Sequence, residues 1–179
     1  MSPDTRKGNH VEASVDPREA ALDVLAQYWA DNDGQVNFPV DPVRIAHALG
    51  VEVVRANLEE DVSGLLVKEP HAENARIFLN RRDHERRQRF TCAHEIGHLT
   101  RRGASADERI GYVDSRDTLS SAGTDPEEVW ANAFAAELLM PAVAVRTLWA
   151  QGKSVPKVAR TFGVSEEAMQ YRLAKLRLS

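Results

Sequence analysis

The chain has 179 residues, of which 42% are hydrophobic and 28% charged, a balance typical of a globular protein with one core. Its 23 lysines and arginines against 27 aspartates and glutamates give a formal net charge of -4, so overall charge does not support nucleic-acid binding. No apolar run approaches the roughly 20 residues of a membrane helix, and the single cysteine, Cys92, excludes a disulfide within the chain. We expect a cytoplasmic protein with no membrane partner and a buried Cys92.

The N-terminal part of the chain predicts a tail followed by two helices. Residues 1–16 are mostly polar and predict a disordered tail. Asp16-Pro17 and Asp41-Pro42 both combine a capping aspartate with a proline at the first helical position, so each predicts a helix start. Gly50 ends the second of these helices.

Three segments then have the composition of strands. Residues 51–54, 62–67 and 75–80 are rich in β-branched and apolar residues and are separated by polar or proline-containing breaks. They predict a small three-stranded antiparallel sheet. A long helix follows, for which Asp83 is the expected N-terminal cap.

Two further features of the middle of the chain have alternative interpretations. Five arginines lie near the start of the long helix: Arg81, Arg82, Arg86, Arg87 and Arg89. Such a cluster indicates either an anionic partner or a solvated helix face, and we favour the solvated face. Residues 100–125 have few apolar anchors and predict a loop that forms a wall of a substrate cleft.

The long helix carries the sequence His94-Glu95-Ile96-Gly97-His98. On a helix His94 and His98 are four residues apart, so both rings project from one face and can bind one metal ion. Glu95, about 100° further round the helix, is placed to hold an activated water as a general base. Such strings also occur by chance, but the pattern favours a zinc hydrolase site.

A catalytic zinc ion usually has three protein ligands and an open fourth position. A helix that starts near Thr124 and stops at Pro141 has Glu127 and Glu128 in its first turn. Thr124 and Glu127 form a capping-box pattern that would occupy Glu127, so we predict Glu128 as the third ligand. Asn132 is four residues further on the same face, where its amide could orient a metal-bound histidine.

These two segments together resemble the ImmA/IrrE family of bacterial and phage metallopeptidases. The similarity extends from about Asp41 to the C-terminus and is strongest in residues 89–99 and 128–141. The resemblance implies a zinc endopeptidase of the gluzincin type, with His94, His98 and Glu128 as ligands of Zn2+ and Glu95 as base. Characterised members cleave a partner transcriptional repressor, which implies a helix-turn-helix repressor as the protein substrate.

For such a peptidase, the strand at residues 75–80 is a hypothetical edge for an extended peptide. The alternative to an enzyme is a DNA- or partner-binding regulator whose metal site is structural or vestigial. An intact Glu95 argues against that alternative, because a purely structural site needs no base beside its ligands.

The C-terminal residues 149–179 predict a helix, a glycine turn and a second helix, which resembles a helix-turn-helix. Glu166 and Glu167 open the second helix, where they would repel DNA, so packing against the core or partner recognition is favoured over DNA binding. We therefore predict an α+β fold with a zincin-type helical core, divided into a tail (1–16), a metallopeptidase domain (17–148) and this C-terminal segment.

Overall fold

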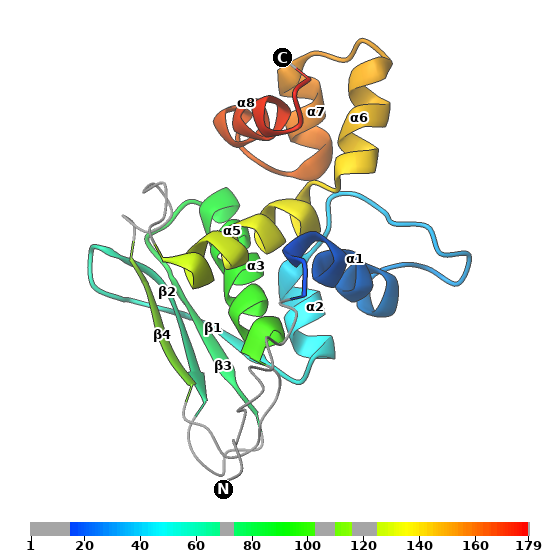
Figure 1. The fold of residues 1–179 in the computed structure, drawn as a ribbon. Helices are drawn as coiled ribbons and strands as arrows, with labels where there is room; N and C mark the ends of the chain where they lie inside the picture. Colours follow the sequence, from blue (N-terminus) through cyan, green and yellow to red (C-terminus); the bar gives the residue numbers. More distant parts are fainter. Residues whose placement is uncertain (1–14, 69–73, 103–109, 116–124, 179) are drawn as a thin grey trace, which may run out of the picture.

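A computed structural model describes residues 15–68, 74–102, 110–115 and 125–178 of the chain. In these ranges the protein forms seven helices and one four-stranded sheet, which confirms the predicted α+β class (Figure 1). The elements are α1 (Pro17–Tyr28), α2 (Pro42–Ala48), β1 (Glu52–Ala56), β2 (Val62–Lys68), β3 (Arg76–Asn80), α3 (Glu85–Arg102), β4 (Ile110–Ser115), α5 (Pro126–Leu139), α6 (Ala142–Ala150), α7 (Val155–Phe162) and α8 (Glu166–Lys175).

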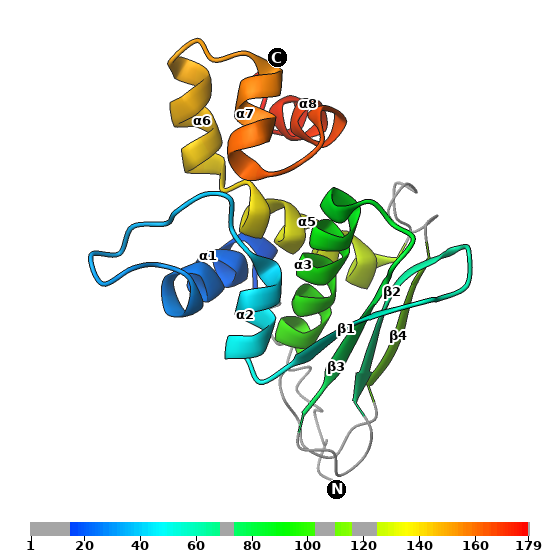
Figure 2. The ribbon, with the colours of Figure 1, turned by 180° about the vertical axis from the view of Figure 1, so that it is seen from behind.

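Helix α3 lies at the centre of the molecule. It packs against β2 and β3 on one side and against α2 and α5 on others, while α1 packs on α5. Figures 1 and 2 show the sheet on one side of α3, with α6, α7 and α8 gathered beyond the C-terminal end of α5. Residues far apart in the chain thus meet around α3.

Both N-terminal helices begin as predicted. Asp16 Oδ1 accepts a hydrogen bond from the backbone N–H of Arg18 at 2.7 Å, and Asp41 Oδ1 accepts one from Val43 at 3.0 Å. Of the predicted tail, residues 1–14 lie outside the described residues. Val15 is held in place, because its carbonyl accepts a hydrogen bond from Trp130 Nε1 of α5 at 2.8 Å.

The sheet has the order β1-β3-β2-β4, and it corrects two predictions. The three predicted strands are present and β2 is antiparallel to β3, but β1 runs parallel to β3, so the all-antiparallel prediction is wrong for that pair. Strand composition indicates where strands occur and does not determine their order: here β3 inserts between β1 and β2. Because β3 has a neighbour on each side, the hypothesis that residues 75–80 offer a free edge is also wrong.

A fourth strand lies within the stretch predicted as a loop. Residues 110–115 form β4, which pairs antiparallel with β2, whereas residues 103–109 and 116–124 lie outside the described residues. Ladder hydrogen bonds to β2 stabilise this segment, and Ile110, Tyr112 and Val113 within it are residue types enriched in strands, a signal that the loop prediction overlooked.

Helix α3 begins one residue later than expected. The backbone N–H of Arg86 donates to His84 Nδ1 at 3.2 Å, and that of Arg87 donates to the His84 carbonyl at 2.8 Å. His84 therefore caps the helix, and the prediction of Asp83 as the cap is wrong. The Asp83 carboxylate instead lies 3.6 Å from Arg87 Nε.

Three arginines near the start of α3 make specific bonds within the fold. Arg87 Nε donates to Ser63 Oγ at 2.9 Å, and Arg81 Nη2 donates to the backbone carbonyl of Arg55 at 3.0 Å. Arg89 Nη2 donates to the carbonyl of Val40 at 2.7 Å. These bonds support a structural role for much of the arginine cluster.

The core forms around α3 and is continuous with the C-terminal helices. Cys92 and Ile96 are fully buried on one side of α3, which confirms the expectation of a buried cysteine. Burial, together with the nearby Glu95 carboxylate, raises the pKa of the Cys92 thiol.

The C-terminal segment forms the two predicted helices, α7 and α8, with Gly163 at φ 66° in the turn between them. Arg172 of α8 forms a buried salt bridge with Glu137 of α5, and its Nε donates to the Met140 carbonyl at 3.0 Å. The Phe162 ring packs edge-on against Phe38, with ring centroids 4.7 Å apart. The predicted boundary at residue 148 lies within α6, and the division into domains stays a prediction.

No single helix in the described ranges is long and apolar enough to cross a membrane. Taken together, α5 and α6 reach the required length and hydropathy, with a bend of 49° at the break between them. Buried core helices of globular proteins also reach this length and hydropathy.

Candidate metal centre

The two histidines of α3 face each other across one helical turn. His94 Nε2 and His98 Nε2 are 2.9 Å apart, and the two side chains are 0% and 2% exposed. Imidazole nitrogens at this separation can bind the same ion after small adjustments. The predicted pairing of His94 with His98 is therefore present in the fold.

Glu128 reaches both rings from the first turn of α5. Its Oε2 lies 3.2 Å from His94 Nε2 and its Oε1 lies 3.3 Å from His98 Nε2. The hydrogen bonds to His94 and then to His98 lower the pKa of Glu128 to about 2, against the opposing effect of burial. His94, His98 and Glu128 thus form a group whose ligand atoms lie within 4.8 Å of one another.

Gly97 explains how α5 comes close enough to place Glu128. A Cβ atom at Gly97 would lie 3.1 Å from Phe134 Cδ1 and 3.3 Å from Ala131 Cα. Because carbon atoms normally pack about 3.5–4.0 Å apart, a side chain here would separate the two helices. The glycine between the histidines therefore permits the close crossing that brings Glu128 to them.

The cap of α5 differs from the predicted capping box. Asp125 Oδ1 accepts a hydrogen bond from the backbone N–H of Glu127 at 2.8 Å, so Asp125 is the cap, and Thr124 lies outside the described residues. The expectation that Thr124 caps this helix and so occupies Glu127 is therefore wrong. As α5 crosses α3, Glu128 faces the histidines, whereas Glu127 is turned about 100° away and lies outside the group.

Asn132 lies one turn after Glu128 on the same helix. Its Oδ1 is 3.0 Å from His94 Nδ1, a distance at which the ring N–H donates to the amide oxygen. With a metal ion bound, a proton held on Nδ1 would leave the Nε2 lone pair of His94 for the ion, on the side of the ring where Glu128 lies. The amide therefore fixes both the ring orientation and the tautomer that a metal ligand needs.

Glu95 lies beside the histidines and is fully buried. Its carboxylate lies against β2, because a Cβ atom at Gly64 of this strand would lie 3.1 Å from Glu95 Oε1. A buried carboxylate next to a metal-binding group is a suitable general base. Gly64 was not among the predicted site residues, although a glycine within a strand signals a close backbone approach.

The donor chemistry of the group fits a divalent metal ion. Two imidazole nitrogens and one carboxylate oxygen are the protein ligands of many catalytic zinc sites, which leave a fourth position open. All three side chains are largely buried and come from two helices that pack directly together. Imidazole also binds other divalent transition-metal ions, so the donor set indicates a divalent transition metal without specifying zinc.

Most of the chain matches one protein family. A family model described as Peptidase_M78, the IrrE N-terminal-like domain, matches residues 46–174, well over half of the chain. The chain belongs to the Peptidase_M78 family. This confirms the resemblance to the ImmA/IrrE metallopeptidases. A search of curated proteins found no match.

The Peptidase_M78 match covers the metal-binding group and also all of α7 and nearly all of α8. The family is one of metallopeptidases, so a protein substrate and hydrolysis of a peptide bond agree with the group of ligands found here. The C-terminal helices thus lie within the range that the family model matches. Arg172 of α8 connects them to α5 through its salt bridge with Glu137.

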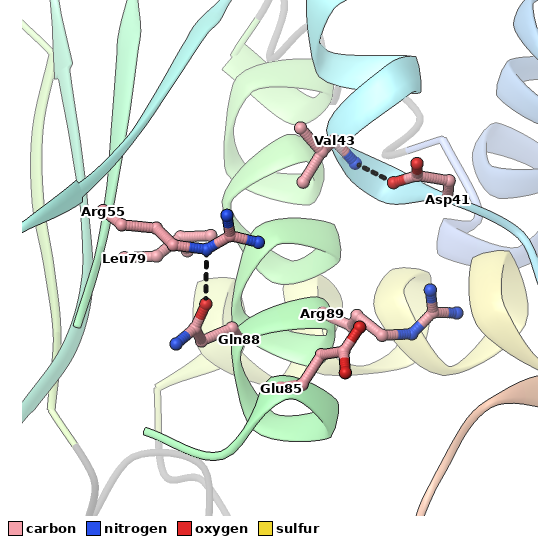
Figure 3. Close-up of a pocket in the computed structure, with 7 residues that line it drawn as sticks. All are labelled: Asp41, Val43, Arg55, Leu79, Glu85, Gln88 and Arg89. Atoms are coloured by element: carbon pink, nitrogen blue, oxygen red, sulfur yellow. Dashed lines mark hydrogen bonds between the residues drawn. The ribbon is translucent and has the colours of Figure 1, made fainter. Parts of the chain in front are cut away.

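A pocket of about 210 Å³ lies away from the metal-binding group, toward the start of α3 (Figure 3). Arg55 Nε donates to Gln88 Oε1 at 2.9 Å there, and Gln88 Nε2 donates to the carbonyl of Asp83 at 2.8 Å. None of the candidate metal ligands lines this pocket; its lining residues are Asp41, Val43, Arg55, Leu79, Glu85, Gln88 and Arg89. It is therefore separate from the candidate metal centre.

Proposed function

We propose that this protein is a zinc-dependent endopeptidase that cleaves a regulatory protein, namely a partner transcriptional repressor. The observation that carries the proposal is the meeting of His94, His98 and Glu128, with Glu95 buried beside them. Membership of the Peptidase_M78 family supports the reaction class. The repressor as substrate rests on the resemblance to ImmA/IrrE members.

In the proposed site, His94, His98 and Glu128 would hold the metal ion, and Asn132 orients the ring of His94. A zinc ion bound there supplies Lewis acidity and lowers the pKa of water toward about 7. Glu95 accepts the proton of the attacking water and then donates it to the leaving amine. The burial of Glu95 keeps bulk water from competing for that proton.

The peptide is proposed to bind along a sheet edge. An extended peptide adds to a sheet through a terminal strand, and the terminal strands of the described sheet are β1 and β4. Because β4 pairs with β2, and β2 approaches Glu95 at Gly64, β4 is the edge strand that adjoins the strand lying against the catalytic group. We assign the substrate to the β4 edge.

The DNA-binding alternative has less support. Arg172, one of the cations of α8, is buried in its pair with Glu137 and is thus not available to a phosphate. The exposed first turn of α8 carries Glu166 and Glu167, which would repel DNA. We therefore propose that α7 and α8 pack on the peptidase core and help to recognise a protein partner.

The proposal is tested with purified protein and each helix-turn-helix repressor encoded beside its gene. We expect zinc-dependent cleavage of one repressor at a single site, abolished by Glu95→Gln with the zinc content unchanged, because the amide cannot accept a proton. Glu127→Gln, one residue from the ligand but outside the group, is the matched control and should cleave normally. Equal cleavage by wild type and Glu95→Gln would contradict the role of Glu95.

A further inference from the structure

Strand β2 approaches α3 at Gly64 more closely than any residue with a side chain would permit. A Cβ atom placed on Gly64 would overlap Thr91 Cγ2, and it would lie 3.1 Å from Glu95 Oε1 and 3.4 Å from the carbonyl oxygen of Phe78. Carbon atoms normally pack about 3.5–4.0 Å apart, so this Cβ atom would collide with Thr91 and press on Glu95, whereas its distance from the Phe78 oxygen is an ordinary contact. The missing side chain is therefore a condition for the present packing of β2 on α3.

The two side chains that face Gly64 have little freedom to move away. Thr91 and Glu95 are both fully buried, and they are four residues apart on the same face of α3. Thr91 is β-branched, so its χ1 angle is restricted on a helix. A methyl group added at residue 64 would consequently push against Thr91 first and against the Glu95 carboxylate second.

The strand is irregular at the same point. The register between β2 and β4 shifts between Val62 and Gly64, which marks a β-bulge or a similar irregularity. Bulges change the direction of a strand locally and are common next to active sites. The irregularity and the close approach therefore coincide at Gly64, directly opposite Glu95.

We propose that Gly64 is a positioning residue for Glu95. The backbone of β2 at Gly64 forms the wall against which the Glu95 carboxylate lies, and the absence of a Cβ atom sets how deeply that carboxylate sits beside His94 and His98. The atoms nearest to a Cβ at Gly64 belong to Thr91, Glu95 and Phe78 and not to a metal ligand, so in this proposal Gly64 acts through Glu95. This inference rests on the proposed function, in which Glu95 is the general base.

Three variants of the full chain separate this role from simple packing. Gly64→Ala adds a methyl group against both Thr91 and Glu95. Gly64→Ala with Thr91→Ser removes Thr91 Cγ2, so the overlap disappears while the methyl group remains next to Glu95. Gly152→Ala is the matched control: nothing lies within 4 Å of its Cβ position, and its φ of 70° makes alanine unfavourable, so it destabilises the fold away from Glu95.

The first readout is cleavage of a quenched fluorescent peptide, chosen from a random library as the one that wild type cleaves fastest. For Gly64→Ala and the double variant we expect wild-type zinc content, an unchanged KM and a kcat about tenfold lower, because small displacements of a catalytic group are costly. The double variant should regain the thermal stability of wild type. The control Gly152→Ala should have the kcat of wild type. A wild-type kcat in the double variant would overturn the inference.

The second readout does not depend on activity. In crystal structures of the zinc-loaded proteins, we expect the Glu95 carboxylate of the double variant to be displaced from its wild-type position while His94, His98 and Glu128 are not. An unmoved carboxylate would overturn the inference. If wild type cleaves no peptide and no repressor, the proposed function fails, and the position of Glu95 still decides whether Gly64 fixes it.

Discussion

Asn132 Oδ1 lies 3.0 Å from His94 Nδ1, on the side of the ring opposite to the nitrogen that faces Glu128. Asn132 and Glu128 are one turn apart on α5, so a single helix supplies a carboxylate to both histidines and an anchor to one of them. The orientation of α5 against α3 consequently determines the geometry of the whole candidate metal centre.

Removing this anchor should weaken metal binding. We expect Asn132→Ala to lower the affinity for zinc by about 10–100-fold, because the ring of His94 loses the partner that fixes its tautomer. Asn132→Asp, which keeps an acceptor, should lose less. The measurement is competition for zinc with a chelator of known affinity, with Gln170→Ala on the exposed side of α8 as the control. Wild-type affinity in Asn132→Ala would contradict this role.

The close crossing of α3 and α5 gives a second prediction. Gly97→Val should reduce zinc binding and lower the free energy of unfolding by about 1–3 kcal/mol, because the side chain would overlap Phe134 and Ala131 and force the helices apart. Ala174→Val makes a similar change at an exposed position of α8 and should leave zinc binding unchanged. Zinc titration and urea unfolding of both variants provide the comparison. Normal zinc binding by Gly97→Val would show that the spacing is not critical.

The residues of the candidate site could be identified from the sequence because their chemistry depends on local periodicity. The spacing of His94 and His98 fixes their relative position on any helix, and so does the spacing of Glu128 and Asn132. Which of two adjacent glutamates meets the histidines depends on how α5 crosses α3. That crossing is set by Gly97 and its contact with Phe134, a tertiary relationship that periodicity does not contain.

The sheet was predicted less completely for a related reason. The positions of β1, β2 and β3 follow from their apolar content, but the insertion of β3 between the other two depends on long-range pairing. Likewise, Asp83 is a residue type that commonly caps helices, whereas it is His84 that accepts the capping hydrogen bond from the backbone N–H of Arg86. A glycine within a strand signals a close approach, but the partners of Gly64 could not be predicted, because Thr91 and Glu95 belong to another element.

The buried pair of Arg172 and Glu137 predicts how the C-terminal helices are held. Arg172→Met should lower the free energy of unfolding by about 3–5 kcal/mol, since it leaves the Glu137 carboxylate buried without its cation. Arg172→Met combined with Glu137→Leu should be less destabilising than the single change, because no charge is then left unpaired. Urea unfolding of the two variants and wild type tests this. Equal stability of Arg172→Met and wild type would argue that α8 is not held by this pair.

The low pKa of Glu128 makes a prediction about pH for the metal-free protein. The pKa in the fold is about 2, below the usual 4.5, so the ionised carboxylate stabilises the fold. This contribution is complete above about pH 4.5 and is lost as the pH falls toward 2. Urea unfolding across this range should show a steeper loss of stability on acidification for wild type than for Glu128→Gln. Parallel curves would contradict the assignment.

The central claim is that His94, His98 and Glu128 hold one metal ion. It is tested most directly by elemental analysis of purified wild type, Glu128→Ala and Glu127→Ala. We predict about one zinc per chain in wild type and in Glu127→Ala, and its loss in Glu128→Ala. Absence of metal from wild type even after zinc is added, or full zinc retention by Glu128→Ala, would contradict the claim.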